Sequence, residues 1–435
     1  MPSDALPGGT TATRFLKEKV WRVIDQAWPQ QVAHLQALVR QPSVLGQEAG
    51  VQRIMQAIFR EMGLEVHTFE PDIGTLKALP GFSPPEWSYR GRPNVVGIWR
   101  SATRGGRSLI LNGHVDVVSP GPLSHWTYDP WSALVVGDRL YGRGALDMKA
   151  GVNAMVWAVR GIQEAGVQLA GDIILQSVIE EEATGNGTLA CLARGFIADG
   201  CLIPEPCYRQ VPTAQVGVLW GRIKVTGRSQ HVGDSRAGVN AIEKMYLLIQ
   251  AMRELEARLN RERPAVFRDV AWPINFNPGV VRGGEWPSTV PAECELEFRM
   301  AFYPGMTSEE AKVLIREHLT ESARRDPWLK EHPPEVTFFG FHADPMTLDF
   351  DASPIIQILD QCHQEVTGVS LKPMASTVTS DARFFSTYYN IPVVCYGPNG
   401  EGAHGADEYV ELPSVLEVTK VIAAFVIDWC GLSKV

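Results

Sequence analysis

The sequence contains no apolar run close to the roughly 20 residues that a helix needs to span a bilayer. Its start, MPSDALPGGTTATRFLKEKV, also lacks the apolar segment of a secretory signal. The seven cysteines include no CxxC pair, so they do not form an obvious disulfide framework. These absences predict a protein without a membrane partner, located in the reducing setting of the cytoplasm.

Positive charge is also scarce. Lysine and arginine together number 40, against 49 aspartates and glutamates, which gives a net charge of −9. A chain this acidic is not expected to bind nucleic acid. The G-x-S-x-G elbow of serine hydrolases is missing as well. What remains is an ordinary soluble composition, 45% hydrophobic and 20% charged, over 435 residues. That length predicts about two domains.

Strands and helices alternate in the first part of the chain. Apolar runs at 94–99, 108–118 and 171–183 indicate strands, and helical periodicity occupies about 49–62 and 147–166. This alternation predicts a three-layer α/β domain. The first dozen residues are small and polar, and are expected to form a mobile tail.

The pattern changes near residue 217. A strand-like run, the helix GVNAIEKMYLLIQAMRELEARLN, two more strand-like runs, the helix SEEAKVLIREHL and the strand-like PEVTFFGF follow in order. This β-α-β-β-α-β order is the ferredoxin-like pattern. We therefore expect a first domain built from residues 1–216 and 344–435, with a small α+β domain inserted at 217–343.

The stretch GHVDVVSP ends a predicted buried strand on His114 and places Asp116 two residues later. Residues i and i+2 of a strand point to the same face, so the two side chains can touch one object or each other. A metal-binding histidine usually passes its second ring N–H to a carboxylate or carbonyl. A simple hydrogen-bonded pair at a strand end is the alternative.

Other acidic and histidine side chains lie at the ends of predicted strands or in loops beside them, where open α/β sheets bind ligands. Taken singly, each has a plain explanation, such as a helix N-cap for Asp147 or a solvated face for three glutamates. Together they provide two histidines and several carboxylates, a suitable ligand set for two zinc ions that share a carboxylate. The set comprises His114, Asp147, Glu180, Glu181, Glu182, Glu205 and His404.

Several motifs occur in a characteristic order: GHVDVV, GDRLYGRGALDMKAG, EEEATGNGT, PEP, GRSQHVGDSRAGVNAI and GAHGADEYV. From about residue 30 to the C-terminus, the chain resembles the co-catalytic di-zinc amidohydrolases and metallopeptidases. This family includes acetylornithine deacetylases, succinyl-diaminopimelate desuccinylases, aminoacylase and glutamate carboxypeptidases. The resemblance implies a zinc-exopeptidase-like catalytic domain with an inserted domain that serves as lid and dimerisation surface.

The resemblance also implies roles for individual residues. Asp147 would bridge two metal ions, and Glu181 would be the general base. Asp116 would orient His114 from behind or act as a nearby structural acid. The remaining ligands would be His114 and Glu205 for one ion, and Glu182 and His404 for the other.

Two residues of the inserted segment match family positions that contact substrate. His231 matches a histidine that, in dimeric relatives, reaches the active site of the partner subunit and stabilises the oxyanion. Arg299 matches an arginine that holds a substrate carboxylate, a task suited to its fork of donors. The resemblance thus predicts a homodimer formed through the inserted domain.

The sequence departs from the familiar pattern at two places. The acidic motif, often Asp-Glu-Glu, is Glu-Glu-Glu here, and a stretch that often carries an asparagine before VP has Ser288 and Thr289 instead. The second change puts one substrate-binding amide in doubt. Trp220, Trp272 and Trp286 could shape an apolar substrate pocket, although core packing is the simpler expectation for each.

The predicted function is hydrolysis of the amide bond of an N-acyl amino acid or related small N-acyl amine. The required cofactors are two divalent ions per chain, with zinc expected and cobalt or manganese as alternatives. A dipeptidase or carboxypeptidase with the same metal site is the nearest alternative. A ligand-binding relative without catalysis is the alternative outside the enzymes.

Overall fold

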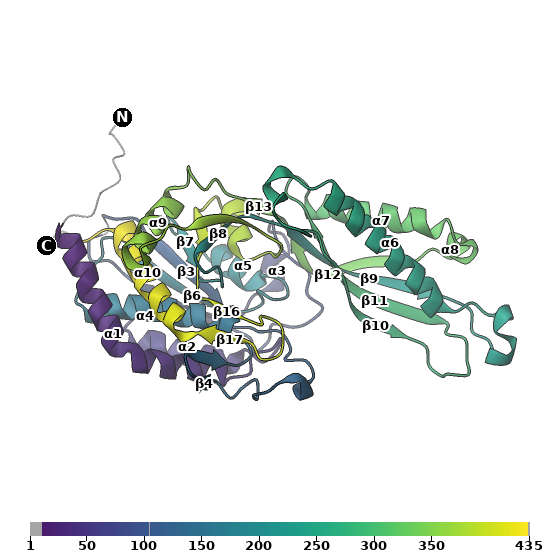
Figure 1. The fold of residues 1–435 in the computed structure, drawn as a ribbon, viewed down its shortest axis with the longest axis horizontal. Coiled ribbons are helices and arrows are strands. Elements are labelled where there is room, and N and C mark those ends of the chain that lie inside the picture. The colour runs from purple at the N-terminus through teal and green to yellow at the C-terminus, as the bar shows by residue number, and fades with distance from the viewer. Residues whose placement is uncertain (1–10, 104, 434–435) are drawn as a thin grey trace.

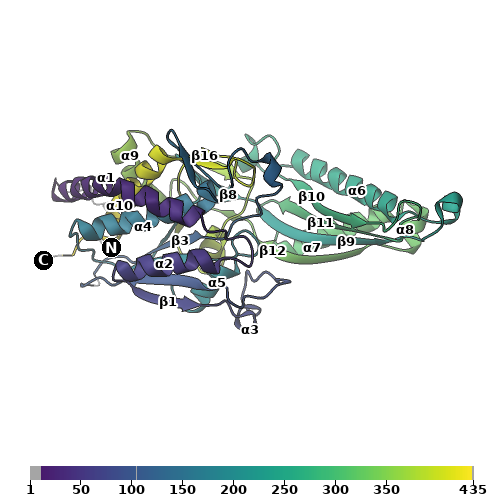
Figure 2. The ribbon, with the colours of Figure 1, turned by 90° about the horizontal axis from the view of Figure 1, so that it is seen from below.

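The computed structural model describes residues 11–103 and 105–433 and has an elongated shape (Figures 1 and 2). A helix-rich body surrounds a six-stranded sheet, and a second, four-stranded sheet extends from one end of that body. The predicted fold class is confirmed. Residues 1–10 of the expected mobile tail lie outside the described residues, and Thr11 and Ala12 already belong to the first helix.

The six-stranded sheet has the order β1-β2-β6-β3-β7-β15. β3, β6, β7 and β15 run parallel, whereas β1 and β2 pair antiparallel with each other and β2 with β6. The bounds are β1 (Glu65–Phe69), β2 (Asn94–Trp99), β3 (Leu109–His114), β6 (Ile173–Val178), β7 (Cys201–Ile203) and β15 (Val393–Cys395). Every residue of β3 and β6 is buried, as expected for parallel strands covered on both faces.

Helices cover both faces of this sheet. Gly113 faces Val152 and Met155 of α4, whereas its neighbour Asn112 hydrogen-bonds to Thr188 of α5 on the opposite face. The helices of the body are α1 (Thr11–Val39), α2 (Ala49–Glu61), α3 (Ile73–Leu76), α4 (Ala150–Glu164), α5 (Asn186–Ala193), α9 (Pro354–Thr367) and α10 (Leu412–Cys430). No helix within the described part of the chain has the length and apolar character to cross a membrane.

The second sheet is antiparallel, with the order β10-β11-β9-β12. In chain order its elements follow the predicted β-α-β-β-α-β pattern, and helices α6 and α7 pack on the sheet (Figure 1). The elements are β9 (Gly217–Thr226), α6 (Ala241–Arg261), β10 (Phe276–Gly283), β11 (Glu293–Phe302), α7 (Ser308–Ala323), α8 (Pro327–Glu331) and β12 (Glu335–Ala343). We call residues 217–343 the inserted segment. Its domain bounds stay a prediction.

Two small sheets were not anticipated from the sequence. They have the orders β13-β8-β14 and β16-β17-β5-β4. Their strands are short and pair segments that lie far apart in the chain, so local sequence patterns do not predict them. The bounds are β4 (Leu134–Val136), β5 (Arg139–Tyr141), β8 (Gln210–Gln215), β13 (Met346–Thr347), β14 (Lys372–Ser376), β16 (Gly400–Glu401) and β17 (Tyr409–Glu411).

A segment of the body, residues 83–87, joins the two sheets. The Pro84 carbonyl accepts from the backbone N–H of Gly340 in β12, and the Ser83 hydroxyl accepts from that of His342. Glu86 forms a two-pronged ion pair with Arg222 of β9, at 3.0 and 2.9 Å. We call residues 83–87 the strap, because they tie the inserted sheet to the body by contacts additional to the two chain crossings.

Candidate metal centre

The candidate ligands gather because parallel strands end at one edge of a sheet. His114 is the last residue of β3, Glu182 follows β6 by four residues, and Glu205 follows β7 by two. His404 comes from the loop between β16 and β17. Asp147 lies in the turn immediately before α4, and its peptide bond to Met148 is cis.

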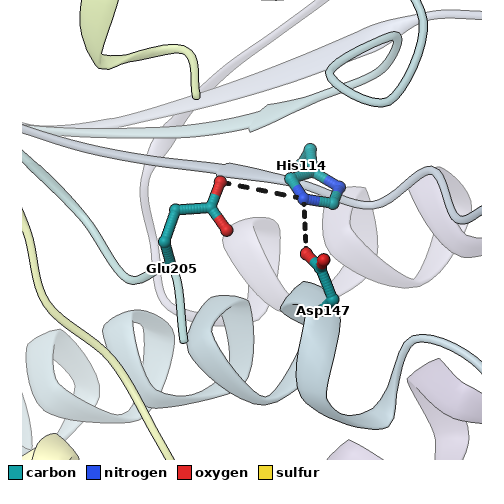
Figure 3. Close-up of side chains that lie close together, drawn as sticks. All are labelled: His114, Asp147 and Glu205. Atoms are coloured by element: carbon teal, nitrogen blue, oxygen red, sulfur yellow. Dashed lines mark hydrogen bonds and ion pairs between the residues drawn. The ribbon is translucent and has the colours of Figure 1, made fainter. Parts of the chain in front are cut away.

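The first group of ligands consists of His114, Asp147 and Glu205, whose side chains point to a common centre (Figure 3). The Nε2 atom of His114 lies 3.2 Å from Oδ1 of Asp147 and 3.8 Å from Oε1 of Glu205. We call this buried set the inner group.

The second group consists of Asp147, Glu182 and His404. The Nε2 atom of His404 lies 3.1 Å from Oε1 of Glu182 and 3.4 Å from Oδ2 of Asp147. Asp147 therefore turns one carboxylate oxygen to each group. We call this more exposed set the outer group.

The spacing of these atoms fits two metal ions. In each group the candidate ligand atoms lie within 4.8 Å of one another. Ligands about 2.0–2.1 Å from a tetrahedral zinc ion stand about 3.3 Å apart, close to the shorter separations in both groups. Imidazole nitrogens with carboxylate oxygens also suit zinc chemically.

The acidic side chains of the centre are crowded and buried. Burial raises the pKa of Asp116 to about 8, and also raises the pKa of Glu205 to about 8 despite the nearby His114. Burial likewise raises the pKa of Glu181 well above its usual range. In each case burial is the main cause and neighbouring carboxylates add to it, so a bound cation would favour the charged forms.

The two histidines respond in the opposite sense. Burial acts to lower the pKa of His114, but its hydrogen bond to Asp147 and the charge of Glu205 raise it well above the usual value. Hydrogen bonds to Asp147 and Glu182 raise the pKa of His404 to about 11. Both shifts show that the carboxylates around these two rings favour positive charge at the centre.

Asp116 supports the centre through both its backbone and its side chain. Its carbonyl oxygen lies 2.9 Å from Nδ1 of His114, which directs Nε2 of that ring towards the inner group. Its carboxylate accepts the backbone N–H groups of Glu181 and Glu182, at 3.3 and 3.1 Å. The orienting role expected of Asp116 thus falls to its carbonyl, while the carboxylate holds the glutamate turn.

Glu181 lies beside the inner group without belonging to it. Its Oε2 atom is 3.9 Å from Nε2 of His114, and the residue is only 7% exposed. Its neighbour Glu182 faces the outer group instead. One glutamate therefore lies beside the inner group, while the other belongs to the outer group.

Glu408 is a functional candidate that sequence reasoning missed. This fully buried carboxylate accepts the backbone N–H groups of Gly144, Leu146 and Asp147 at 2.9–3.0 Å, and the guanidinium of Arg143 at 2.6 Å. It thereby fixes the turn that presents Asp147. Its only sequence signal is its place four residues after His404 in GAHGADEYV.

A cavity of about 560 Å³ opens beside the outer group. Glu182 and His404 line it on the side of the body, and strands of the inserted sheet supply the opposite wall. That wall is largely aromatic, with Trp220 packed edge-on against Phe341 at a centroid distance of 5.3 Å. The residues of the inserted segment that line the cavity are Trp220, Asn275, Asn277, Gly279, Val280, Glu297, Phe298, Arg299, Phe339 and Phe341.

Arg299 lies on this wall, as expected of a substrate-binding residue. Its Nη2 atom donates to the carbonyl of Thr377 at 3.2 Å, and burial lowers its pKa. Among the described residues, no carboxylate forms an ion pair with it. Arg299 is thus a largely buried cation that lines the cavity without an ion-pair partner among the described residues, although Glu182 and Glu297 line the same cavity.

His231, in contrast, is not brought to the centre of its own chain. It is exposed in the loop after β9, where its Nδ1 accepts the N–H of Gly233 at 3.1 Å. β9 begins next to the body at Gly217 and runs ten residues away from it, a length of about 33 Å. The neighbouring hairpin carries Thr289, which bridges to His231, and Trp286.

Core packing is the wrong expectation for two of the three tryptophans. Trp272 and Trp286 are 49% and 69% exposed, because they stand in the loops before and after β10. Trp220 lies on the cavity wall instead of within a closed core.

Known proteins are similar to this chain in sequence and in fold. The model of peptidase family M20/M25/M40 matches residues 110–428. A deformylase of N-formyl-4-amino-5-aminomethyl-2-methylpyrimidine from Halalkalibacterium halodurans is 32% identical over 367 residues, which cover 80% of this chain and 85% of that protein.

Two solved structures share the fold. The dipeptidase Dug1p from Saccharomyces cerevisiae has a TM-score of 0.75 at 16% identity, over 95% of this chain and 98% of that one. The YXEP protein of Bacillus subtilis, described as a dinuclear metal-binding peptidase of family M20, has a TM-score of 0.58 at 12% identity, over 93% and 98% of the two chains. The family match, the identity to the deformylase and the shared fold together show that this chain is an amide-bond hydrolase of peptidase family M20/M25/M40.

Proposed function

We propose that the protein removes a short acyl group from an N-acyl amine, using two divalent metal ions, most suitably zinc. The observation that carries the proposal is the pair of ligand groups that share Asp147, with Glu181 beside them. His114 and Glu205 would complete the inner ion, and Glu182 and His404 the outer ion. The ions, when bound, would polarise the amide carbonyl and acidify the attacking water.

The remaining steps fall to side chains of this chain. Glu181 accepts a proton from the water as its oxygen attacks the carbonyl carbon, and then delivers that proton to the leaving nitrogen. Its buried position favours the protonated form between the two transfers, because burial raises its pKa. Asp116 accepts the backbone N–H of Glu181, so the Glu181 carboxylate keeps its orientation during both proton transfers.

The acyl group is proposed to be small, with formyl as the first candidate. The support is the 32% identity to a protein named as a deformylase of an aminomethylpyrimidine. The aromatic wall of the cavity offers faces against which a flat ring could stack, and Asn275 and Asn277 offer amide groups for ring nitrogens. In this arrangement the amine portion of the substrate occupies the cavity.

A carboxylate-bearing substrate, an N-acyl amino acid or a dipeptide, is the second candidate. The observation that favours it is Arg299, which faces the same cavity without an acidic partner among the described residues. A substrate carboxylate would supply the missing counter-charge. The fold shared with the dipeptidase Dug1p is compatible with this candidate.

A substrate panel separates the two candidates. Zinc-loaded protein would be assayed with an N-formyl aminomethylpyrimidine, N-formyl, N-acetyl and N-succinyl amino acids, and dipeptides. The proposal expects the highest kcat/KM for an N-formyl or N-acetyl amine. Preferential cleavage of dipeptides would replace it with the peptidase assignment, and Arg299→Ala would then raise KM for carboxylate-bearing substrates alone.

We also propose a homodimer formed through the inserted segment. β10 is an edge strand of its sheet and exposes Val281, while the adjacent helix α6 exposes Ile242 and Tyr246. An apolar edge next to an apolar helix face favours pairing with a second copy. A dimer would also give His231 a centre to act on, because its own lies most of the length of β9 away.

Sedimentation and subunit mixing test the dimer. Val281→Asp should produce monomers. Mixing inactive Glu181→Gln with inactive His231→Ala subunits should restore activity, since a mixed dimer contains one complete site. Full subunit exchange without recovery would exclude action across the dimer.

The seven cysteines are all free thiols, which supports the predicted cytoplasmic setting.

A further inference from the structure

Glu180 is the first of three consecutive glutamates and has no part in the chemistry described so far. It belongs to neither ligand group and does not line the cavity. It is nevertheless completely buried. Burial of a charged carboxylate is unfavourable unless several hydrogen-bond donors satisfy it.

Five side-chain contacts satisfy this carboxylate. The indole N–H of Trp87 lies 3.0 Å from each of its oxygens, and hydroxyls of Tyr89 and Thr184 donate at 3.2 and 2.9 Å. The guanidinium of Arg92 completes the set and is itself bound to Glu48. The Glu180 side chain therefore has one well-determined position.

The backbone of Glu180 is equally constrained. Its φ of 74° lies in the left-handed region, which residues with a Cβ rarely adopt. Its carbonyl accepts the N–H groups of Thr184 and Gly185, at 2.8 and 2.6 Å. The chain thus makes a sharp turn at Glu180, two residues after the end of β6, and that turn sets the directions of the Glu181 and Glu182 side chains.

We propose that Glu180 is a positioning residue, which Trp87 and Arg92 hold in place so that Glu181 points at the reacting water. The inference rests on the proposed role of Glu181 as general base. Asp116 holds the same turn from the other side through the N–H groups of Glu181 and Glu182. The base is thereby clamped between two buried carboxylates that do not themselves react.

Trp87 gives this anchor a second connection. It is the last residue of the strap, and its neighbour Glu86 binds Arg222 of the inserted sheet. The Asn186 side chain at the start of α5 also bonds both the Ser83 carbonyl and the Tyr89 hydroxyl. The anchor of the base is therefore continuous with the contact that holds the cavity wall.

Kinetics of two conservative variants test the proposal. Trp87→Phe keeps the ring and removes the indole donor, and Glu180→Gln keeps the length and removes the charge that Arg92 binds. Both full-length, zinc-loaded proteins should lose about 10- to 100-fold in kcat, the range for removing a supporting contact. KM and metal content should stay within twofold of the parent.

Two further variants make the result decisive. Asp428→Asn removes the negative charge that contacts the buried Lys17 at 2.6 Å, far along the chain from the metal ligands, and should lower stability without changing kcat. Glu181→Gln, measured alongside, tests the base separately. If Glu181→Gln is inactive while Trp87→Phe keeps full kcat, the positioning role is wrong and the base assignment stands. Loss that follows metal content or KM would also overturn it. If Glu180→Gln does not fold, Trp87→Phe alone decides.

Discussion

The inner and outer groups share Asp147 and use the same kinds of ligand, yet they differ in exposure. The side chain of His114 is 1% exposed, whereas that of His404 is 53% exposed. His114 ends a strand in the middle of the sheet and has its second ring nitrogen fixed by a backbone carbonyl. His404 stands in a short loop with a left-handed backbone, at a φ of 63°.

This difference separates two tasks that one dinuclear centre must perform. Ligands that are packed and oriented before binding lose little freedom when an ion arrives, so the inner group should hold its ion more tightly. The outer group borders the cavity and must admit substrate. We therefore expect the ion at the buried position to anchor the centre and the ion at the exposed position to exchange.

Removing the shared ligand should have the largest effect. Asp147→Ala takes one oxygen from each group, so the comparison between them disappears and both ions should be lost with all measurable turnover. Elemental analysis after gel filtration would follow metal content. Retention of one ion per chain would show that Asp147 serves a single group.

Glu181→Gln should separate chemistry from binding. We expect kcat to fall about 10²- to 10⁴-fold, the usual effect of removing a general base, while both ions remain bound. Kinetic assays on metal-quantified protein provide the measurement. Near-normal turnover with two ions present would point to Glu182 as the next residue to examine.

The two histidines test the comparison directly. His404→Ala should leave about one ion per chain, whereas His114→Ala should weaken both because the buried position anchors the centre. Competition with a chelator, monitored by metal release, ranks the affinities. Equal loss in the two variants would show that burial does not distinguish the groups.

Glu408→Gln should have an intermediate effect. Its carboxylate holds the turn that presents Asp147 to both groups, so metal affinity or activity should fall about 10- to 100-fold. Glu411→Gln, three residues later at the end of β17 and bonded to Asn399, is a matched control. Identical behaviour of the two variants would remove Glu408 from the centre.

The smallest effect concerns stability without metal. Asp116 and Glu205, each with a pKa of about 8 in the fold, bind protons that the unfolded chain releases near pH 4. The stability of chelated protein should therefore fall as pH rises from about 5 to 8. Added zinc should raise the melting temperature more at pH 8 than at pH 5, which scanning calorimetry can measure. A flat profile would mean that the buried acids do not retain protons.

The sequence predicted the fold and the residues of the candidate centre better than the contacts that support them. His114, Glu182 and Glu205 follow apolar runs that announce strands, and parallel strands end at a common edge. Glu408 could not be found in this way, because its partner Asp147 lies 261 residues earlier. The division of Asp116 into an orienting carbonyl and a holding carboxylate also depends on where β6 lies beside β3.

For the inserted segment too, the sequence predicted local structure better than long-range arrangement. Periodicity predicted its β-α-β-β-α-β order, since strands and helices leave local patterns. Exposure of Trp272 and Trp286 was missed because a large apolar residue gives no sign of which loop will bury it. The distance of His231 from its own centre follows from the direction of β9, which only the three-dimensional arrangement fixes.

The strap has a consequence for protein engineering. The inserted segment joins the body through two neighbouring chain crossings and looks like a module that could be exchanged for one with another cavity wall. Residues 83–87, however, hold β9 and β12 from outside the segment and also reach the glutamate turn. A chimaera that changes residues 217–343 alone would keep a strap whose side chains do not match the new sheet. Transplanting the strap together with the segment preserves the match between cavity and catalytic turn.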